Sequence, residues 1–164
     1  MTPYHAVSVT TGGVQRYVIW IEGNDGPDRL AVDGGRIVSW SGMEKLRLYA
    51  ARRRWVLAEA PLIVDLDAAS AWVHGSGELD PAVLLSAWNL CWDVARSVDA
   101  TFDDRREQRD HVYDKLFWAT NVPVTSPAGE PLESQWSTEE IQVLRDVLSE
   151  GITLAQAALA GRGE

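Results

Sequence analysis

The chain contains 164 residues, of which 46% are hydrophobic and 24% are charged, a length and balance that predict one folded domain and exclude a disordered chain. No apolar run is long enough to cross a bilayer, and residues 1–13 lack the basic start and apolar centre of a signal peptide, so we expect a cytoplasmic protein without a membrane partner. The formal net charge of −9 argues against a nucleic-acid partner, because phosphates would be repelled, and suits a basic partner.

Strand signals fill the beginning of the chain. Residues 14–21 are rich in aromatic and β-branched side chains and end at a cluster of turn residues, which predicts a strand followed by a loop. Residues 30–32 and 36–40 flank Asp33-Gly34-Gly35, whose glycines permit a tight hairpin. We therefore expect an antiparallel meander, preceded by residues 1–12 as either an edge strand or a loose extension.

A helix is predicted next, from about residue 42 to residue 53. Ser41 and Glu44 have the spacing of a capping box, in which a hydroxyl and a carboxylate bind the free amides of the first turn. The arginines at 52–54 fall at the negative end of this helix, so we interpret them as a C-terminal cap in preference to a nucleic-acid patch.

Residues 62–66 predict a buried strand, and Asp67 is expected to cap a short helix that ends near Val73. Asp65 and Asp67 alternate along the strand, so their carboxylates could share a hard cation. Without a second acidic pair nearby, we favour a capping residue beside a solvated one.

The core helix is expected to begin at Asp80-Pro81, because aspartate binds free amides and proline suits the first helical position. Apolar residues then recur every three or four positions from Leu84 to Val98. Cys91 lies within this stripe, where we expect a buried hydrophobe and not a reactive thiol.

Two further helices are predicted. Asp103 or Asp104 can cap the first, which should stop at residues 121–123. The capping box Ser137–Glu140 begins the last, and Gly151 is its expected left-handed stop.

The expected fold is a single α+β domain spanning residues 1–164. A small antiparallel sheet from the N-terminal half packs against the C-terminal helices, and residues 153–164 form either a helical extension or a frayed tail.

The sequence offers little for catalysis. His111 and Asp114 have the spacing of two metal ligands on a helix, but no third ligand lies near them in sequence, so we expect an ordinary surface pair. No nucleophile elbow, phosphate loop or dinucleotide fingerprint is present. We therefore expect no catalytic residue, no metal and no cofactor. A dispersed active site remains the alternative.

Residues 84–152 resemble immunity proteins of contact-dependent growth inhibition and related polymorphic toxin systems. The matching segments are Leu84–Leu90, Asp93–Ser97, Tyr113–Trp118 with Asn121 and Pro123, and Trp136-Ser137 with the helix that closes on Glu150-Gly151-Ile152. We expect the aromatic and polar residues of the pattern to be scaffold: Trp88, Asn89, Tyr113, Asp114, Lys115, Phe117, Trp118 and Trp136. Residues 1–12 and the arginines at 52–54 fall outside it.

The resemblance implies a non-catalytic protein that binds the C-terminal domain of a cognate toxin one-to-one. Many such toxins are nucleases with cationic surfaces. The alternative from another class is an interaction or regulatory module with no toxin. A gene for a toxin domain directly beside this one would favour the first.

Charge independently indicates a surface for a basic partner. Residues 59–104 contain nine acidic residues and one base, whereas residues 36–54 carry a net charge of +5. The candidate partner-binding residues flank the turn between two predicted helices: Asp93, Asp99, Asp103 and Asp104. The competing interpretation is a solvated acidic face.

Overall fold

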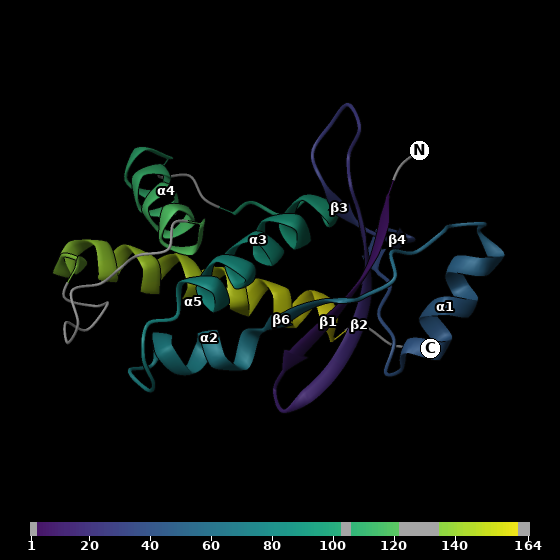
Figure 1. Cartoon of the computed structure of the whole chain (residues 1–164), viewed down its shortest axis with the longest axis horizontal. Coiled ribbons are helices and arrows are strands. Elements are labelled where there is room, and N and C mark those ends of the chain that lie inside the picture. Colours follow the sequence, from purple (N-terminus) through teal and green to yellow (C-terminus); the bar gives the residue numbers. More distant parts are fainter. Residues whose placement is uncertain (1–2, 103–105, 122–134, 161–164) are drawn as a thin grey trace.

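The computed structural model describes residues 3–102, 106–121 and 135–160 (Figure 1). It confirms the expected α+β fold. A four-stranded sheet with strand order β3-β2-β1-β6 is built from β1 (Tyr4–Thr11), β2 (Val14–Ile21), β3 (Arg29–Leu30) and β6 (Leu62–Asp65). Figure 1 shows this sheet with α1 at one end of the molecule and α2 to α5 toward the other.

The first strand lies inside the sheet, and not at its edge or in a loose extension as predicted for residues 1–12. β1 pairs with β2 along its whole length, from Tyr4 opposite Ile21 to Thr11 opposite Val14. On its other side it pairs with β6, so it lies inside the sheet. The β1–β6 pairing is parallel, because the chain crosses over through α1 before returning. The sheet is therefore mixed, and the expected antiparallel arrangement holds only for β3-β2-β1.

The predicted tight hairpin forms a separate two-stranded sheet of β4 (Val32–Asp33) and β5 (Arg36–Ile37). Gly34 and Gly35 make its turn with φ angles of 56° and 76°. Both values lie in the left-handed region that glycine enters without steric cost.

The main sheet buries both of its faces, because side chains alternate along each strand. Val7, Val9 and Val18 enter the larger core with the C-terminal helices, whereas Ala6 and Ile19 belong to a smaller core with α1.

Helix α1 (Met43–Arg52) lies where the sequence predicts it, but its predicted capping box is absent. Gly42 is the N-cap and no side chain caps it. The C-terminal end carries Arg53, whose guanidinium lies 3.8 Å from the centre of the Tyr49 ring.

Strand β6 lies at the sheet edge and is buried only in part of the range expected: Leu62 is 46% exposed and Ile63 is 74% exposed, whereas Val64 is buried. Asp65, and not Asp67, caps the following helix α2 (Leu66–Val73), where its Oδ1 accepts from the Ala68 amide at 2.9 Å.

The carboxylate of Asp67 instead accepts from the amides of Gly12 and Gly13, at 2.6 and 2.8 Å. It therefore ties the β1–β2 turn to α2, a contact between residues more than 50 positions apart.

The three C-terminal helices are α3 (Pro81–Ser97), α4 (Arg106–Asn121) and α5 (Thr138–Leu159). Asp80 caps α3 and the Ser137–Glu140 box caps α5, as predicted. The predicted cap at Asp103 or Asp104 and the part of the predicted helix stop at residues 122–123 lie outside the described parts of the chain.

Gly151 does not end α5, because the helix continues to Leu159. The residue lies inside the helix instead, where a Cβ atom would come within 2.7 Å of the Cys91 Cβ. Glycine here allows the close approach of α5 to α3. Within the described residues, no helix is long and apolar enough to cross a membrane.

Candidate functional site

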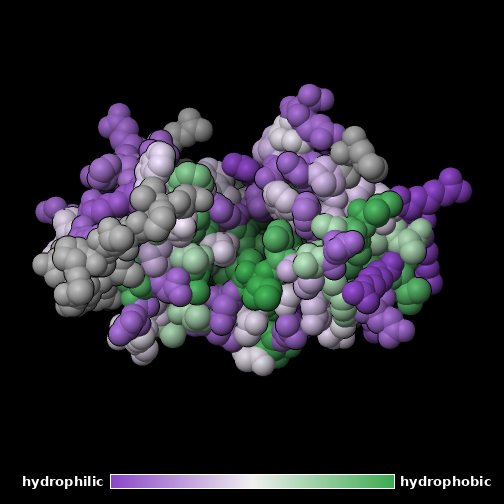
Figure 2. Space-filling view, viewed as in Figure 1, coloured by the Kyte–Doolittle hydropathy of each residue, from purple (hydrophilic) through white to green (hydrophobic). Residues whose placement is uncertain are grey.

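An open groove of about 650 Å³ lies between α3, α4 and one side of the sheet, and we call it the α3 groove. Its volume falls in the usual range for ligand pockets, about 300–1,000 Å³. Figure 2 shows the hollow between the surface over α4 and the surface over β2 and β3, with apolar residues below it. The charged side chains of its lining are Asp28, Asp93, Arg96 and Asp110, which give a formal charge of −2.

Helix α3 supplies a polar stripe to this groove. Ser86, Asn89, Asp93 and Arg96 are spaced three and four residues apart, which places them on one side of the helix. Opposite them, β2 contributes Trp20, the loop before β3 contributes Asp28, and β1, β6 and α4 contribute further walls. The polar side of α3 therefore forms one wall of a concavity.

Asp93 is largely enclosed, with 14% of its side chain exposed. Its Oδ2 accepts a hydrogen bond from the Trp20 Nε1 at 3.1 Å, and its Oδ1 lies 3.7 Å from a guanidinium nitrogen of Arg96. Burial raises the pKa of Asp93 to about 6, and the negative charge of Asp28 adds to the increase. Arg96 and the Trp20 bond offset only part of it.

Aromatic rings contact both members of the Asp93–Arg96 pair. The Arg96 guanidinium lies 4.8 Å from the centre of the Trp92 ring, in cation–π geometry. Trp92 in turn meets the edge of Phe102, and Trp20 packs against His5 from β1 with ring centres 5.0 Å apart. These contacts hold both indoles in place beside the groove.

The structure describes two of the four predicted partner-binding residues, Asp93 and Asp99, and places only Asp93 in the lining of the groove. Asp93 is enclosed in the groove and is not an exposed charge. Asp99 is exposed, follows the C-terminal end of α3 with a φ of 52°, and does not line the groove. Asp103 and Asp104 lie outside the described residues.

Sequence reasoning missed Asp28 and Asp110, the two carboxylates that join Asp93 in the groove. They come from the loop before β3 and from α4. The polar stripe of α3 was a usable signal, but nothing local indicates which elements enclose it.

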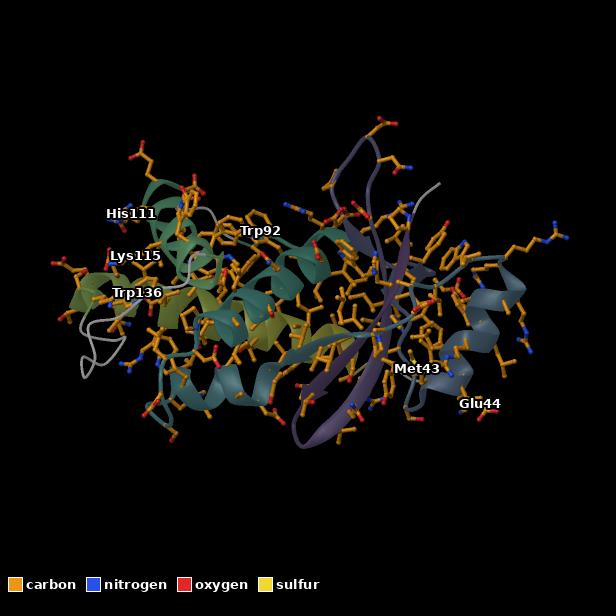
Figure 3. All side chains as sticks on the ribbon, viewed as in Figure 1. Met43, Glu44, Trp92, His111, Lys115 and Trp136 are labelled. Carbon is orange, nitrogen blue, oxygen red and sulfur yellow. The ribbon has the colours of Figure 1, made fainter. Side chains whose placement is uncertain are left out.

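Most of the residues on which the resemblance to immunity proteins depends make contacts that join the three C-terminal helices. The Tyr113 hydroxyl donates to the Asn89 Oδ1 at 2.9 Å, which links α4 to α3. Lys115 Nζ donates to the Gln135 carbonyl at 2.7 Å and to a Glu140 carboxylate oxygen at 2.6 Å, and it lies 4.7 Å from the centre of the Trp136 ring. Figure 3 shows Lys115 and Trp136 close together where α4 meets the start of α5.

Other members of the pattern divide between core and surface. Trp88 is buried and meets the Tyr113 ring edge-on. Asp114 is exposed, as are Phe117 and Trp118, the latter by 62%. These last three residues are placed on the outer face of α4.

Groups that could carry chemistry are sparse in the described part of the chain. It contains no cluster of three or more histidine, cysteine or acidic residues that could hold a metal ion. His111 pairs with Glu140 at 3.3 Å. Cys91 is buried, and burial raises the pKa of its thiol to about 12, as expected for a core residue.

No family model and no curated protein matches the sequence. The chain is similar in fold to the crystal structure of the SatS C-terminal domain in complex with bromine, with a TM-score of 0.54. The alignment covers 98% of this chain and 94% of that one, at 13% sequence identity. At this identity the similarity concerns the fold alone, and it covers the α+β arrangement from end to end.

Proposed function

We propose that this protein is an immunity protein that neutralises a cognate toxin domain by stoichiometric binding in the cytoplasm. The observation that carries the proposal is the acidic α3 groove, which is concave, open to solvent and walled by aromatic side chains. The resemblance over residues 84–152 supplies the class of partner.

The groove suits a basic protein segment. Its lining carries three carboxylates and one guanidinium, within a chain whose net charge is −9. Complementary charge raises the rate and specificity of association more than its affinity. A nuclease toxin with a cationic surface would meet this requirement.

The arrangement of polar groups supports binding more than catalysis. The enclosed carboxylate accepts from an indole and lies beside an arginine, and Tyr113 is bonded to Asn89. Neither pair has the geometry of a nucleophile held by a general base. Binding that covers or distorts the toxin requires no chemistry from these residues.

The test is rescue. The C-terminal domain encoded by the neighbouring gene is expressed in cells with and without this protein, and we expect growth only in its presence. The two proteins should also co-purify one-to-one. Loss of both rescue and co-purification would remove the immunity hypothesis in favour of a module unrelated to toxins.

A further inference from the structure

We propose that the α3 groove is a receptor site for a guanidinium or ammonium group carried by a segment of the partner. Asp93 is the counter-ion, and Arg96 is an internal cation that the partner's group displaces. The inference deepens the proposed function and rests on it for the partner's identity, but the site can be tested without that partner.

Asp93 is poorly compensated in the free protein. Of its two side-chain partners one is a neutral indole N–H, and the other, Arg96, lies 3.7 Å away. A close charge-assisted hydrogen bond is about 2.7–2.9 Å long. A cation seated directly on this carboxylate would therefore gain an interaction that the free protein leaves incomplete.

Arg96 shows where such a cation fits. Its guanidinium lies beside the carboxylate of Asp93 and over the ring of Trp92. The Arg96 side chain is also 41% exposed, and its nearest nitrogen lies 3.7 Å from the Asp93 Oδ1, farther than in a close charge-assisted hydrogen bond. It can therefore leave the position at small cost, which makes it a placeholder and not a permanent partner.

The surroundings favour a peptide-borne cation over a free metal ion. Trp20 and Trp92 provide indole surfaces for cation–π contact, which metal-binding sites do not need. Asp28 and Asp110 add long-range attraction from two other elements. The groove also reaches the exposed aliphatic side chain of Leu62, against which the stem of an arginine or lysine can pack.

The test uses a blocked tripeptide, acetyl-Gly-Arg-Gly-amide, titrated at millimolar concentration into the full-length protein. Its matched control carries citrulline, which keeps the shape of arginine and removes the charge. The readout is the indole N–H resonance of Trp20, assigned by its loss in Trp20→Phe. We expect the arginine peptide to shift this resonance to saturation and the citrulline peptide to leave it unchanged.

Two variants should move the affinity in opposite directions. Asp93→Asn keeps the acceptor for Trp20 and removes the charge, so binding should weaken tenfold or more. Arg96→Met removes the internal cation and keeps an apolar stem beside Trp92, so binding should tighten severalfold. Asp99→Asn, which removes a charge outside the groove, should change nothing.

Equal binding of the citrulline peptide, or unchanged binding to Asp93→Asn, would overturn the inference. So would weaker binding to Arg96→Met, because it would make Arg96 a structural partner. If the toxin domain is neutralised while the arginine peptide fails to bind, the proposed function stands and only this site is wrong. If the peptide binds while rescue fails, the site stands and the toxin hypothesis falls.

Discussion

At the scale of single residues, the buried charge of Asp93 lowers the stability of the fold and is available to bind a cation. Its carboxylate is enclosed between Trp20 and Arg96, and burial raises its pKa to about 6. A charge that destabilises the free protein and lines a groove is typical of functional sites. Because the Asp93 carboxylate is ionised at neutral pH, it can bind a cation, but its buried charge lowers the free energy of unfolding.

Replacing Asp93 with asparagine should therefore stabilise the protein at pH 7. The folded pKa of about 6 lies above the ordinary value of 3.8 for aspartate, so the folded chain binds more protons between these pH values and stability falls as pH rises through them. This rise of the Asp93 pKa to about 6 corresponds to at most about 3 kcal/mol. Urea unfolding from pH 4 to pH 7.5 should show Asp93→Asn more stable than wild type by about 1–3 kcal/mol above pH 6. The difference should shrink toward pH 4.

The control is Asp99→Asn, because Asp99 is exposed and asparagine tolerates its positive φ. It should show no such pH-dependent difference. An Asp93→Asn protein that is less stable than wild type at pH 7 would mean that the ion pair with Arg96 outweighs the cost of burial.

Gly151 is constrained by packing and not by backbone conformation. Alanine is favoured over glycine inside a helix by about 1 kcal/mol. Here its Cβ would lie 2.7 Å from the Cys91 Cβ and 3.0 Å from the Phe102 ring, and overpacking of this kind costs about 1–3 kcal/mol or more. We expect Gly151→Ala to lower the melting temperature, whereas Ser149→Ala at an exposed position of the same helix should not. A higher melting temperature for Gly151→Ala would mean that α3 and α5 are less closely packed.

At the scale of elements, the N-terminal ends of α1 and α5 are capped differently, although both have the sequence of a capping box. Ser137 and Glu140 form both bonds of the box, at 3.1 and 2.9 Å. Ser41 makes no capping bond, because Gly42 takes the N-cap position of α1. Ser137→Ala should cost about 1 kcal/mol of unfolding free energy in chemical denaturation, and Ser41→Ala close to none. Equal losses would indicate that α1 also uses its serine in solution.

At the scale of the whole molecule, the most basic segment of the chain does not line the acidic groove. The +5 segment from residue 36 to residue 54 includes α1, which lies at the opposite end from α4 (Figure 1). The acidic groove lies between α3, α4 and the sheet, so a cationic partner approaching from the α4 side meets the carboxylates first. A dipolar molecule of this kind orients an oppositely charged partner during encounter.

This arrangement predicts different effects for two matched charges on α4. Asp110 lines the groove and Asp114, one helical turn later, does not. Asp110→Asn should slow association with the toxin domain severalfold and flatten its salt dependence, as measured by stopped-flow, whereas Asp114→Asn should have little effect. Equal effects of both variants would place the binding surface on the outer face of α4, near Trp118.

The elements whose signals are local could be predicted from the amino-acid sequence. The strand at Val14–Ile21, the Gly34-Gly35 turn, the Asp80-Pro81 helix start and the Ser137–Glu140 box all lie as predicted. Each depends on side chains and amides only a few residues apart. Helix caps, turn geometry and strand composition act over that distance, so the amino-acid sequence contains the information needed to predict these elements.

The features that depend on distant partners could not be predicted before the fold was known. β1 is an inner strand because β6 pairs beside it. Gly151 has no room for a Cβ atom because Cys91 lies against it. Asp67 accepts a hydrogen bond from a turn more than 50 residues away. The groove has the same origin. Asp93 appears in the sequence as one more polar position on an amphipathic helix, and its burial and raised pKa arise only when Trp20 and α4 close around it. Burial is a property of the packed arrangement, which no local pattern of residues encodes.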